Sequence, residues 1–219
     1  MSDNKQIEME PVVAKDLRSL KKIIKKAIKK NGNNCDLNFI DVSALTDLSG
    51  LFRFAETRKF NGDIRQWDVS NVTNMSHMFE KSKFNGDISQ WDVSNVTNMN
   101  CMFRESKFNG DISQWGVSNV KNMRRMFYGA AVFNGDISKW DVSSVTDMSK
   151  MFAFSRFNGD ISKWDVSKVE NMECMFLHTN FNGNISKWDV SNVKNKAGMI
   201  AKCSILNGSY DEVHAKLPF

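Results

Sequence analysis

Carboxylates recur along this chain at a fixed interval, and they are its most regular residues with chemical potential. One position carries the side chains of Asp63, Asp87, Asp111, Asp136, Asp160 and Asn184. A second column of aspartates follows five residues later in each unit and is interrupted at Gly116. Stacked carboxylates repel one another, so they need either calcium, which binds oxygen ligands, or backbone N–H donors in Asx-turns. Because Asn184 and Gly116 break the columns, we favour backbone capping over a calcium site.

A neighbouring position changes from glutamine to lysine halfway along the chain. The last three units place Lys139, Lys163 and Lys187 there, each two residues before the second aspartate column. Residues two apart on a strand share a face, so we predict a solvated sheet face on which these charges neutralise each other. The alternative is a groove that follows a phosphate backbone. The aspartates would repel a polyanion, and nucleic acid is therefore not the expected partner.

Catalytic chemistry finds little support among the other polar residues. The three histidines, His77, His178 and His214, stand at unrelated positions, and the chain has no glycine-rich phosphate loop or HExxH sequence. No CxxC pair and no metal-ligand spacing occurs among the four cysteines, which are Cys35, Cys101, Cys174 and Cys203. We therefore expect reduced structural thiols, no metal, no cofactor and no enzymatic activity.

One long phrase positions all of these residues, because it occurs six times. It reads FNGDIRQWDVSNVTNMSHMF from Phe60 and returns from Phe84, Phe108, Phe133, Phe157 and Phe181, at intervals of 24 or 25 residues. A period of this length is typical of a solenoid, in which each unit buries its apolar face against its neighbours. We expect the core to contain all six tryptophans, which are Trp67, Trp91, Trp115, Trp140, Trp164 and Trp188. The alternative is an exposed platform on which sugars or bases stack.

Two periodicities alternate within each unit. Trp67 and Val69 are two residues apart, which indicates a short strand. From Val72 to Phe79 the apolar residues step mainly by three, which indicates a helical turn, and the Asn-Gly pair before each Asp marks a tight turn. The predicted fold class is therefore an α/β solenoid, with one short parallel strand and one short helical turn in each coil of 24–25 residues.

The repeated phrase resembles the unit of a known family. FNGDISxWDVSNVTNMxxMF is similar to the repeat of the BspA-like and Mycoplasma-lipoprotein-type surface proteins, a divergent branch of the leucine-rich repeats. The resemblance covers residues 37–203 and implies a curved, leucine-rich-repeat-like solenoid. It also implies a non-enzymatic scaffold for protein–protein recognition, acting at the cell surface in adhesion or host contact.

The chain itself favours a different setting. It shows no signal peptide, no lipidation cysteine and no apolar run long enough to span a membrane, which points to the cytoplasm. An intracellular interaction module, phage- or defence-related, is therefore the alternative function. A calcium- or glycan-binding solenoid is a third possibility. In the first two settings we expect the partner to be a protein.

The two ends of the array differ from its middle. We divide the chain into a leader and basic amphipathic helix (residues 1–36), a degenerate first repeat (37–59), the six-repeat solenoid (60–203) and a C-terminal cap (204–219). The helix is predicted from Pro11 to about Lys30 and carries eight cationic side chains against Asp16, whereas residues 31–219 are neutral overall. We expect it to close the N-terminal end of the core. Contact with a membrane surface, nucleic acid or an acidic protein is the alternative.

The positions at which the repeats differ are the best candidates for recognition. At the two positions after each Met-Phe pair, repeats one and two carry charged residues, whereas repeats three to five bring Tyr128, Phe154 and Leu177. Arg124 and Arg125 flank them. We predict an apolar protein-binding patch made by these five residues. The alternative is that the apolar side chains tuck into neighbouring turns.

Overall fold

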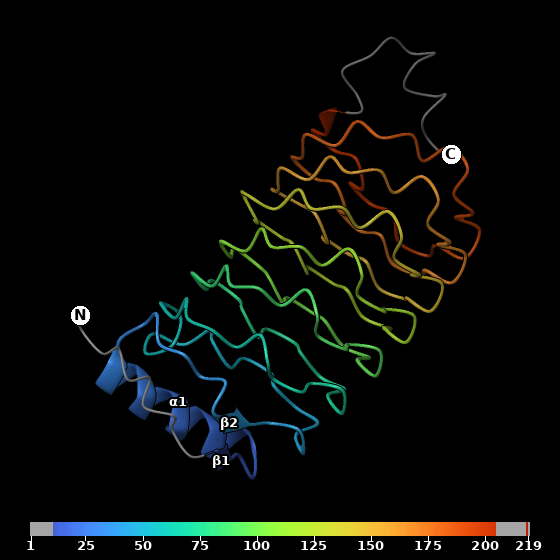
Figure 1. Cartoon of the computed structure of the whole chain (residues 1–219). Helices are drawn as coiled ribbons and strands as arrows, with labels where there is room; N and C mark the ends of the chain where they lie inside the picture. Colours follow the sequence, from blue (N-terminus) through green and yellow to red (C-terminus); the bar gives the residue numbers. More distant parts are fainter. Residues whose placement is uncertain (1–10, 205–217, 219) are drawn as a thin grey trace.

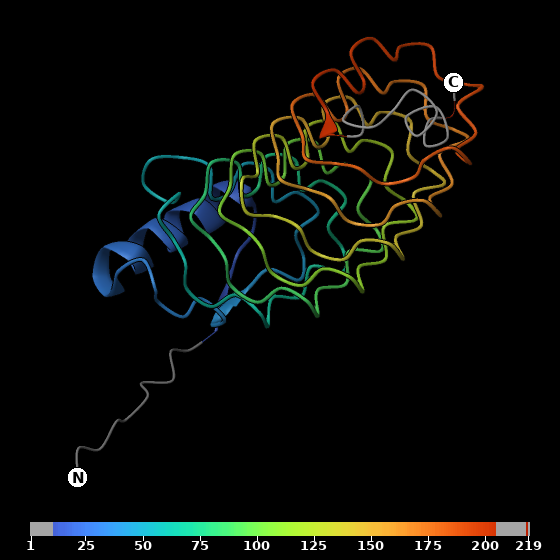
Figure 2. The same cartoon turned by 90° about the horizontal axis from the view of Figure 1, so that it is seen from above.

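The computed structural model describes residues 11–204 and residue 218, and its regular elements lie near the N-terminal end. In these residues the helices and strands are β1 (Val12–Val13), α1 (Leu17–Asn31) and β2 (Ile40–Asp41). From β2 onward the chain runs through turns and bends, which wind in successive, similar loops from the blue end to the red end of Figure 1. Figure 2 shows the same loops from above, with α1 at their N-terminal end.

Successive repeats lie beside one another in register. Parallel bridges join each repeat to the next through equivalent residues: Asp47 to Asn74, Asn74 to Asn98, Asn98 to Asn122, Asn122 to Asp147, Asp147 to Asn171 and Asn171 to Asn195. The degenerate first repeat, which contributes Asp47, therefore shares the register of the six repeats. The pairing runs through the residue before the first methionine of each repeat, and not through the Trp-Val segment in which the sequence predicted a strand.

The sequence predicted a helical turn from Val72 to Phe79, but residues 75–82 form linked reverse turns instead. Alternate N–H groups donate to the carbonyl three residues earlier, as Met78 does to Met75 at 3.2 Å. The others donate to the next repeat, as His77 does to the Asn100 carbonyl at 2.8 Å. Every buried backbone donor needs an acceptor, and here half of the donors find theirs in the neighbouring repeat, which a helix would not allow. We call residues 75–82, 99–106, 123–130, 148–155 and 172–179 the turn segments, and their outward side chains the turn face.

Each tryptophan is buried and connects its repeat to the preceding one. The six indoles are only 3–4 % exposed. The indole N–H of Trp140 donates to the carbonyl of Ile112 in the preceding repeat at 3.0 Å, and the other five indoles make equivalent bonds. The backbone N–H of Trp140 is already bonded to Ile137, three residues earlier, at 3.2 Å. It is therefore not available for the strand ladder that the alternating pattern suggested.

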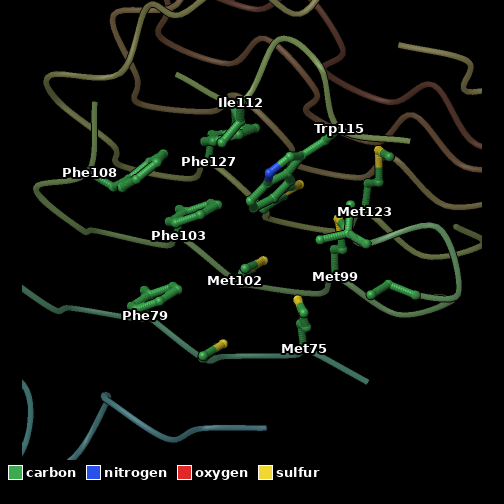
Figure 3. Close-up of a cluster of buried hydrophobic side chains, with 14 of the residues drawn as sticks. Met75, Phe79, Met99, Met102, Phe103, Phe108, Ile112, Trp115, Met123 and Phe127 are labelled. Atoms are coloured by element: carbon green, nitrogen blue, oxygen red, sulfur yellow. The ribbon is translucent and has the colours of Figure 1, made fainter. Parts of the chain in front are cut away.

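Phenylalanines and methionines fill the remaining core in columns. Phe79, Phe103 and Phe127 lie one above another in Figure 3, with ring centroids 5.5 and 5.6 Å apart. A column of methionines that begins with Met75 runs beside them, and all of these side chains are fully buried. Burial of one such side chain contributes about 1.5–3 kcal/mol. Each ring also stacks on the phenylalanine that opens the next repeat, as Phe103 does on Phe108 at 4.3 Å.

The sequence predicted a helix that starts at Pro11, but α1 begins at Leu17. Val12–Val13 form β1 and pair in parallel with Ile40–Asp41 of β2, a conformation that suits β-branched residues. The helix then starts after Asp16, whose carboxylate accepts the Ser19 N–H at 2.6 Å, while the Ser19 hydroxyl accepts the Asp16 N–H at 3.0 Å. This capping box satisfies two N–H groups that have no partner within the helix.

The apolar face of α1 packs on the core. Leu20, Ile24 and Ala27 are buried among the apolar residues of the following repeats. The helix ends at Asn31 and is capped by Gly32, whose φ of 83° favours glycine. Apart from Ser204 and Pro218, the C-terminal cap predicted for residues 204–219 lies outside the described residues.

Candidate functional site

The aspartates of the two columns cap the backbone locally. Asp87 Oδ1 accepts the backbone N–H of Ser89 at 3.0 Å, and hydrogen bonds from Ser89 hold the pKa of Asp87 below its ordinary value. Asn184 makes the same bond to Ser186 at 3.0 Å, so the position needs an oxygen acceptor and not a charge. Within residues 11–204 and 218, no cluster of three or more His, Cys, Asp or Glu side chains is suited to hold a metal ion.

The lysine column stands in solvent. Lys139, Lys163 and Lys187 are exposed, and none of them is among the ion pairs within 4.0 Å that occur in the described part of the chain. Hydrogen bonds from Ser138 lower the pKa of Asp136, and the charge of Lys139 adds to this effect. Lys139 and Lys163 therefore act on Asp136 and Asp160 through their charge, without the direct pairing that we expected.

A charge network on the turn face escaped the sequence reasoning. The Glu80 carboxylate is buried and lies 2.7 Å from His77 Nδ1, 2.9 Å from Arg104 Nη1 and 3.4 Å from Arg53 Nε. Its partners come from the degenerate first repeat and from repeats one and two. The signal that could have found the network is the register itself, because residues one period apart lie side by side.

The thiol of Cys101 occupies the repeat position equivalent to His77, but it does not suit nucleophilic chemistry. Burial raises the pKa of the Cys101 thiol, and the negative charge of Glu80 raises it further. A nucleophilic cysteine needs a lowered pKa and access to solvent, whereas Cys101 is buried. This thiol therefore behaves as a core residue.

The tip of each turn segment requires a backbone conformation that most side chains avoid. Positive φ values of 52–63° occur at the equivalent residues Lys81, Glu105, Gly129, Phe154, His178 and Lys202. Glycine adopts this conformation freely, and other residues do so at a cost. Phe154 combines it, at φ 58°, with a bulky apolar side chain that is 47 % exposed. This residue is therefore disfavoured both by its backbone and by its solvation.

An aromatic row crosses repeats three to five on the turn face. The ring of Phe154 lies 5.5 Å from that of Tyr128 and 5.0 Å from that of His178, measured between centroids. The guanidinium groups of Arg104 and Arg125 lie over the Tyr128 ring at 5.4 and 6.0 Å. The structure thus brings together Tyr128, Phe154 and Arg125, as the sequence suggested, and adds Arg104 and His178, which the sequence reasoning did not include.

The other residues of the predicted patch are less exposed. Leu177 is half-buried, and its carbonyl accepts the N–H of Phe154 at 2.8 Å. Arg124 and Arg125 are half-buried, and the Arg125 N–H donates to the Ser149 carbonyl at 2.9 Å. Tyr128 is also half-buried. Packing into neighbouring turns therefore describes Leu177 and Tyr128 in part, but it does not describe Phe154.

The comparisons with known proteins give a family but no closer relative. Two stretches, residues 18–127 and 104–213, match the family model described as "Mycoplasma protein of unknown function, DUF285". The comparison with curated proteins found no match, and the comparison with solved structures found none either. The two stretches overlap within the repeats and together span most of the chain, so this protein belongs to that Mycoplasma family of unknown function.

Proposed function

We propose that this chain is a non-enzymatic scaffold for protein–protein recognition, built as a leucine-rich-repeat-like solenoid of the BspA-like kind. The common register of the repeats and the apolar columns between them support this proposal, since stacked repeats form extended and rigid surfaces. The binding surface in this proposal is the turn face of repeats three to five. The observation that carries it is the exposed Phe154 at a turn tip.

The energetics of Phe154 favour recognition over folding as its role. A left-handed conformation costs a residue other than glycine about 1–2 kcal/mol. Exposure also forgoes part of the roughly 1.5–3 kcal/mol that burial of a phenylalanine contributes. Gly129 occupies the equivalent position one repeat earlier and avoids both costs. The other turn tips share the positive φ, so the feature particular to Phe154 among these tips is its exposed apolar ring, from which we infer that it serves a binding partner.

The neighbours of Phe154 have the character of a protein interface. Interface residues that dominate binding energy are enriched in tyrosine and arginine, and here Tyr128 lies between Phe154 and two guanidinium groups. The backbone beneath them is held by bonds between repeats, such as that from the Gly129 N–H to the Ala153 carbonyl at 2.9 Å. A surface that is already ordered loses little entropy when it binds.

The substitution Phe154→Gly tests the proposal. It removes the ring contacts, worth about 0.5–1.5 kcal/mol, and relieves a backbone cost of similar size, so the stability of the fold should change by less than about 1 kcal/mol. Phe154→Lys is a second variant, because Lys81 and Lys202 occupy equivalent tips. The matched control is Phe54→Ala, since Phe54 is 46 % exposed and lies at the other end of the array.

Affinity capture from cells of the source organism, followed by mass spectrometry, provides the measurement. The wild type and Phe54→Ala should retain the same proteins, whereas both Phe154 variants should lose them while melting within a few degrees of the wild type. Capture of the same proteins by folded Phe154→Gly and Phe154→Lys would show that the turn face of repeats three to five is not the binding surface.

The place of action distinguishes two forms of this function. The family resemblance favours adhesion or host contact at a cell surface. Cys35, Cys101 and Cys174 are free thiols, which suits a reducing compartment and favours an intracellular module. No helix in the described residues has the length and apolar character needed to cross a bilayer. Protease treatment of intact cells separates the two forms, because only a surface protein is digested.

A further inference from the structure

The turn face of repeats three to five carries an excess of positive charge. Its charged outward residues are Arg124, Arg125 and Lys150 against Glu173, a net charge of +2, within an array that is neutral overall from residue 31 onward. Lys150 and Glu173 form an ion pair at 2.8 Å. The excess therefore belongs to the two consecutive arginines.

Arg124 and Arg125 differ from the other cations of this face in having no acidic partner. Arg104 pairs with Glu80 at 2.9 Å and with Glu105 at 2.8 Å. In the residues that the structure describes, neither Arg124 nor Arg125 forms an ion pair or a side-chain hydrogen bond, and the Nε of Arg125 is buried without a partner. In that described part of the chain, the terminal Nη donors of both guanidinium groups are thus not committed to an ion pair or a hydrogen bond.

The charges of Arg124 and Arg125 act on the carboxylate of Glu173, which already forms an ion pair with Lys150. A hydrogen bond from Lys150 lowers the pKa of Glu173, and the charges of Lys150, Arg124 and Arg125 lower it further. Because Lys150 holds this carboxylate at 2.8 Å, Glu173 does not neutralise the arginine pair. A second anion is needed for that.

The arginines and the aromatic row form one continuous surface. Arg125 lies over the ring of Tyr128, which in turn lies against Phe154. An arginine fork recognises carboxylates through two parallel hydrogen bonds. The exposed Phe154, on the other side of Tyr128, offers an apolar contact, so a ligand that fits both has negative charge near an apolar side chain.

We propose that the turn face of repeats three to five binds an acidic segment of a partner protein, with carboxylates on Arg124 and Arg125 and an apolar side chain on Phe154. This inference rests on the proposed recognition function and specifies the chemistry of the partner. A nucleic acid would also bring negative charge, but it would meet the exposed aspartate columns along the same array, whose charge repels a polyanion.

A peptide library displayed on phage and selected on the full-length chain tests the inference without a known partner. The selected peptides should be rich in Asp and Glu next to an aromatic or aliphatic residue. A synthetic copy of the best peptide is then measured by fluorescence anisotropy. The paired change Arg124→Glu and Arg125→Glu should weaken its binding by about 30-fold or more, as expected when one partner of a desolvated charge pair is lost.

Two further variants complete the test. Arg124→Lys with Arg125→Lys keeps the charge but removes the fork, so the affinity should fall between those of the wild type and the glutamate variant. Lys139→Glu with Lys163→Glu applies the same change of net charge on the exposed lysine column and should leave binding within about twofold of the wild type once salt screens distant charges.

The outcomes separate this inference from the function on which it rests. Selected peptides that are neutral or basic, or acidic peptides that bind the arginine variants as tightly as the wild type, would overturn the proposal of an acidic partner. If these peptides bind the wild type but not Phe154→Gly, recognition by this face would still be supported. A selection that yields no peptide dependent on Phe154 would overturn both.

Discussion

At the scale of single residues, the tryptophan indole has two roles in every repeat. Its ring fills the core beside the phenylalanine columns, as Trp115 does in Figure 3, and its N–H reaches a buried carbonyl of the preceding repeat. Loss of the ring therefore opens a cavity, whereas loss of the N–H alone removes one of the two hydrogen bonds that this carbonyl accepts. These two effects have different magnitudes and can be measured separately.

Trp140 lies in the fourth repeat, where both neighbours are present. Trp140→Ala should lower the free energy of unfolding by about 3–5 kcal/mol, because a large aromatic side chain is removed from a packed core. Trp140→Phe should cost less, about 1–3 kcal/mol, since it keeps an aromatic ring but loses the hydrogen bond to the Ile112 carbonyl, which retains only its bond from the Trp115 N–H at 3.2 Å. Urea unfolding of the three proteins measures both values. Equal midpoints for the wild type and Trp140→Ala would contradict the buried position.

The capping aspartates make stability depend on acid. Side-chain and backbone hydrogen bonds from the serine two residues later lower the pKa values of Asp92 and Asp165 in the folded chain, whereas the unfolded chain has the ordinary value of about 3.9. A lowered folded pKa contributes stability above the unfolded value, and this contribution is lost as the pH falls through the folded value.

The melting temperature should therefore stay nearly constant between pH 7 and pH 5, and it should decrease once the pH is lower than about 4. Replacement of Asp92 by Asn should keep the cap, as Asn184 does, and remove the share of this acid sensitivity that comes from Asp92. A scan of melting temperature against pH provides the measurement. A chain that gains stability on acidification below pH 4 would contradict the capping role.

At the scale of elements, α1 covers apolar residues at the N-terminal end of the repeats. Ile24 is fully buried, whereas Lys26 is exposed on the opposite side of the helix. Ile24→Ala should lower the free energy of unfolding by about 2–5 kcal/mol, and Lys26→Ala should change it by no more than about 0.5 kcal/mol. Chemical unfolding of the two variants checks this difference. Similar small effects for both would mean that α1 is not packed on the core.

The sequence predicted the period and the inward tryptophans, but it misassigned the local elements. The spacing of three between Met75 and Met78 fits a helical turn and a reverse turn equally well, and hydrogen bonds to the next repeat decide between them. In the same way, Pro11 and the apolar spacing from Val13 favoured a helix start, whereas Val12–Val13 pair in parallel with β2. Local periodicity does not contain the contacts between repeats that settle these choices.

The candidate site could likewise be predicted only where neighbouring repeats alone determine which residues meet. Tyr128 and Phe154 were predictable as neighbours because they are variable residues in adjacent repeats, and the structure places their rings 5.5 Å apart. The network around Glu80 was not, because it joins side chains from three successive repeats. The positive φ of Phe154 was also not visible, because phenylalanine itself gives no sign of a left-handed backbone.

At the scale of the whole molecule, equivalent side chains run through the repeats in continuous columns. Phe152 and Phe176 in repeats four and five stack at 5.8 Å, much as Phe52 and Phe79 do at 5.5 Å at the other end. In such an array each unit depends on its neighbours for its buried surface. One shared core therefore holds the aromatic row and the arginine pair in fixed positions.

Acrylamide quenching of tryptophan fluorescence tests this shared core most directly, because all six indoles report on it and the chain has no other tryptophan. In the native protein the indoles, 3–4 % exposed, should be protected from the quencher, and the protection should be lost in a single transition as urea is added. Native indoles that are quenched as strongly as those of the urea-unfolded chain would contradict the account.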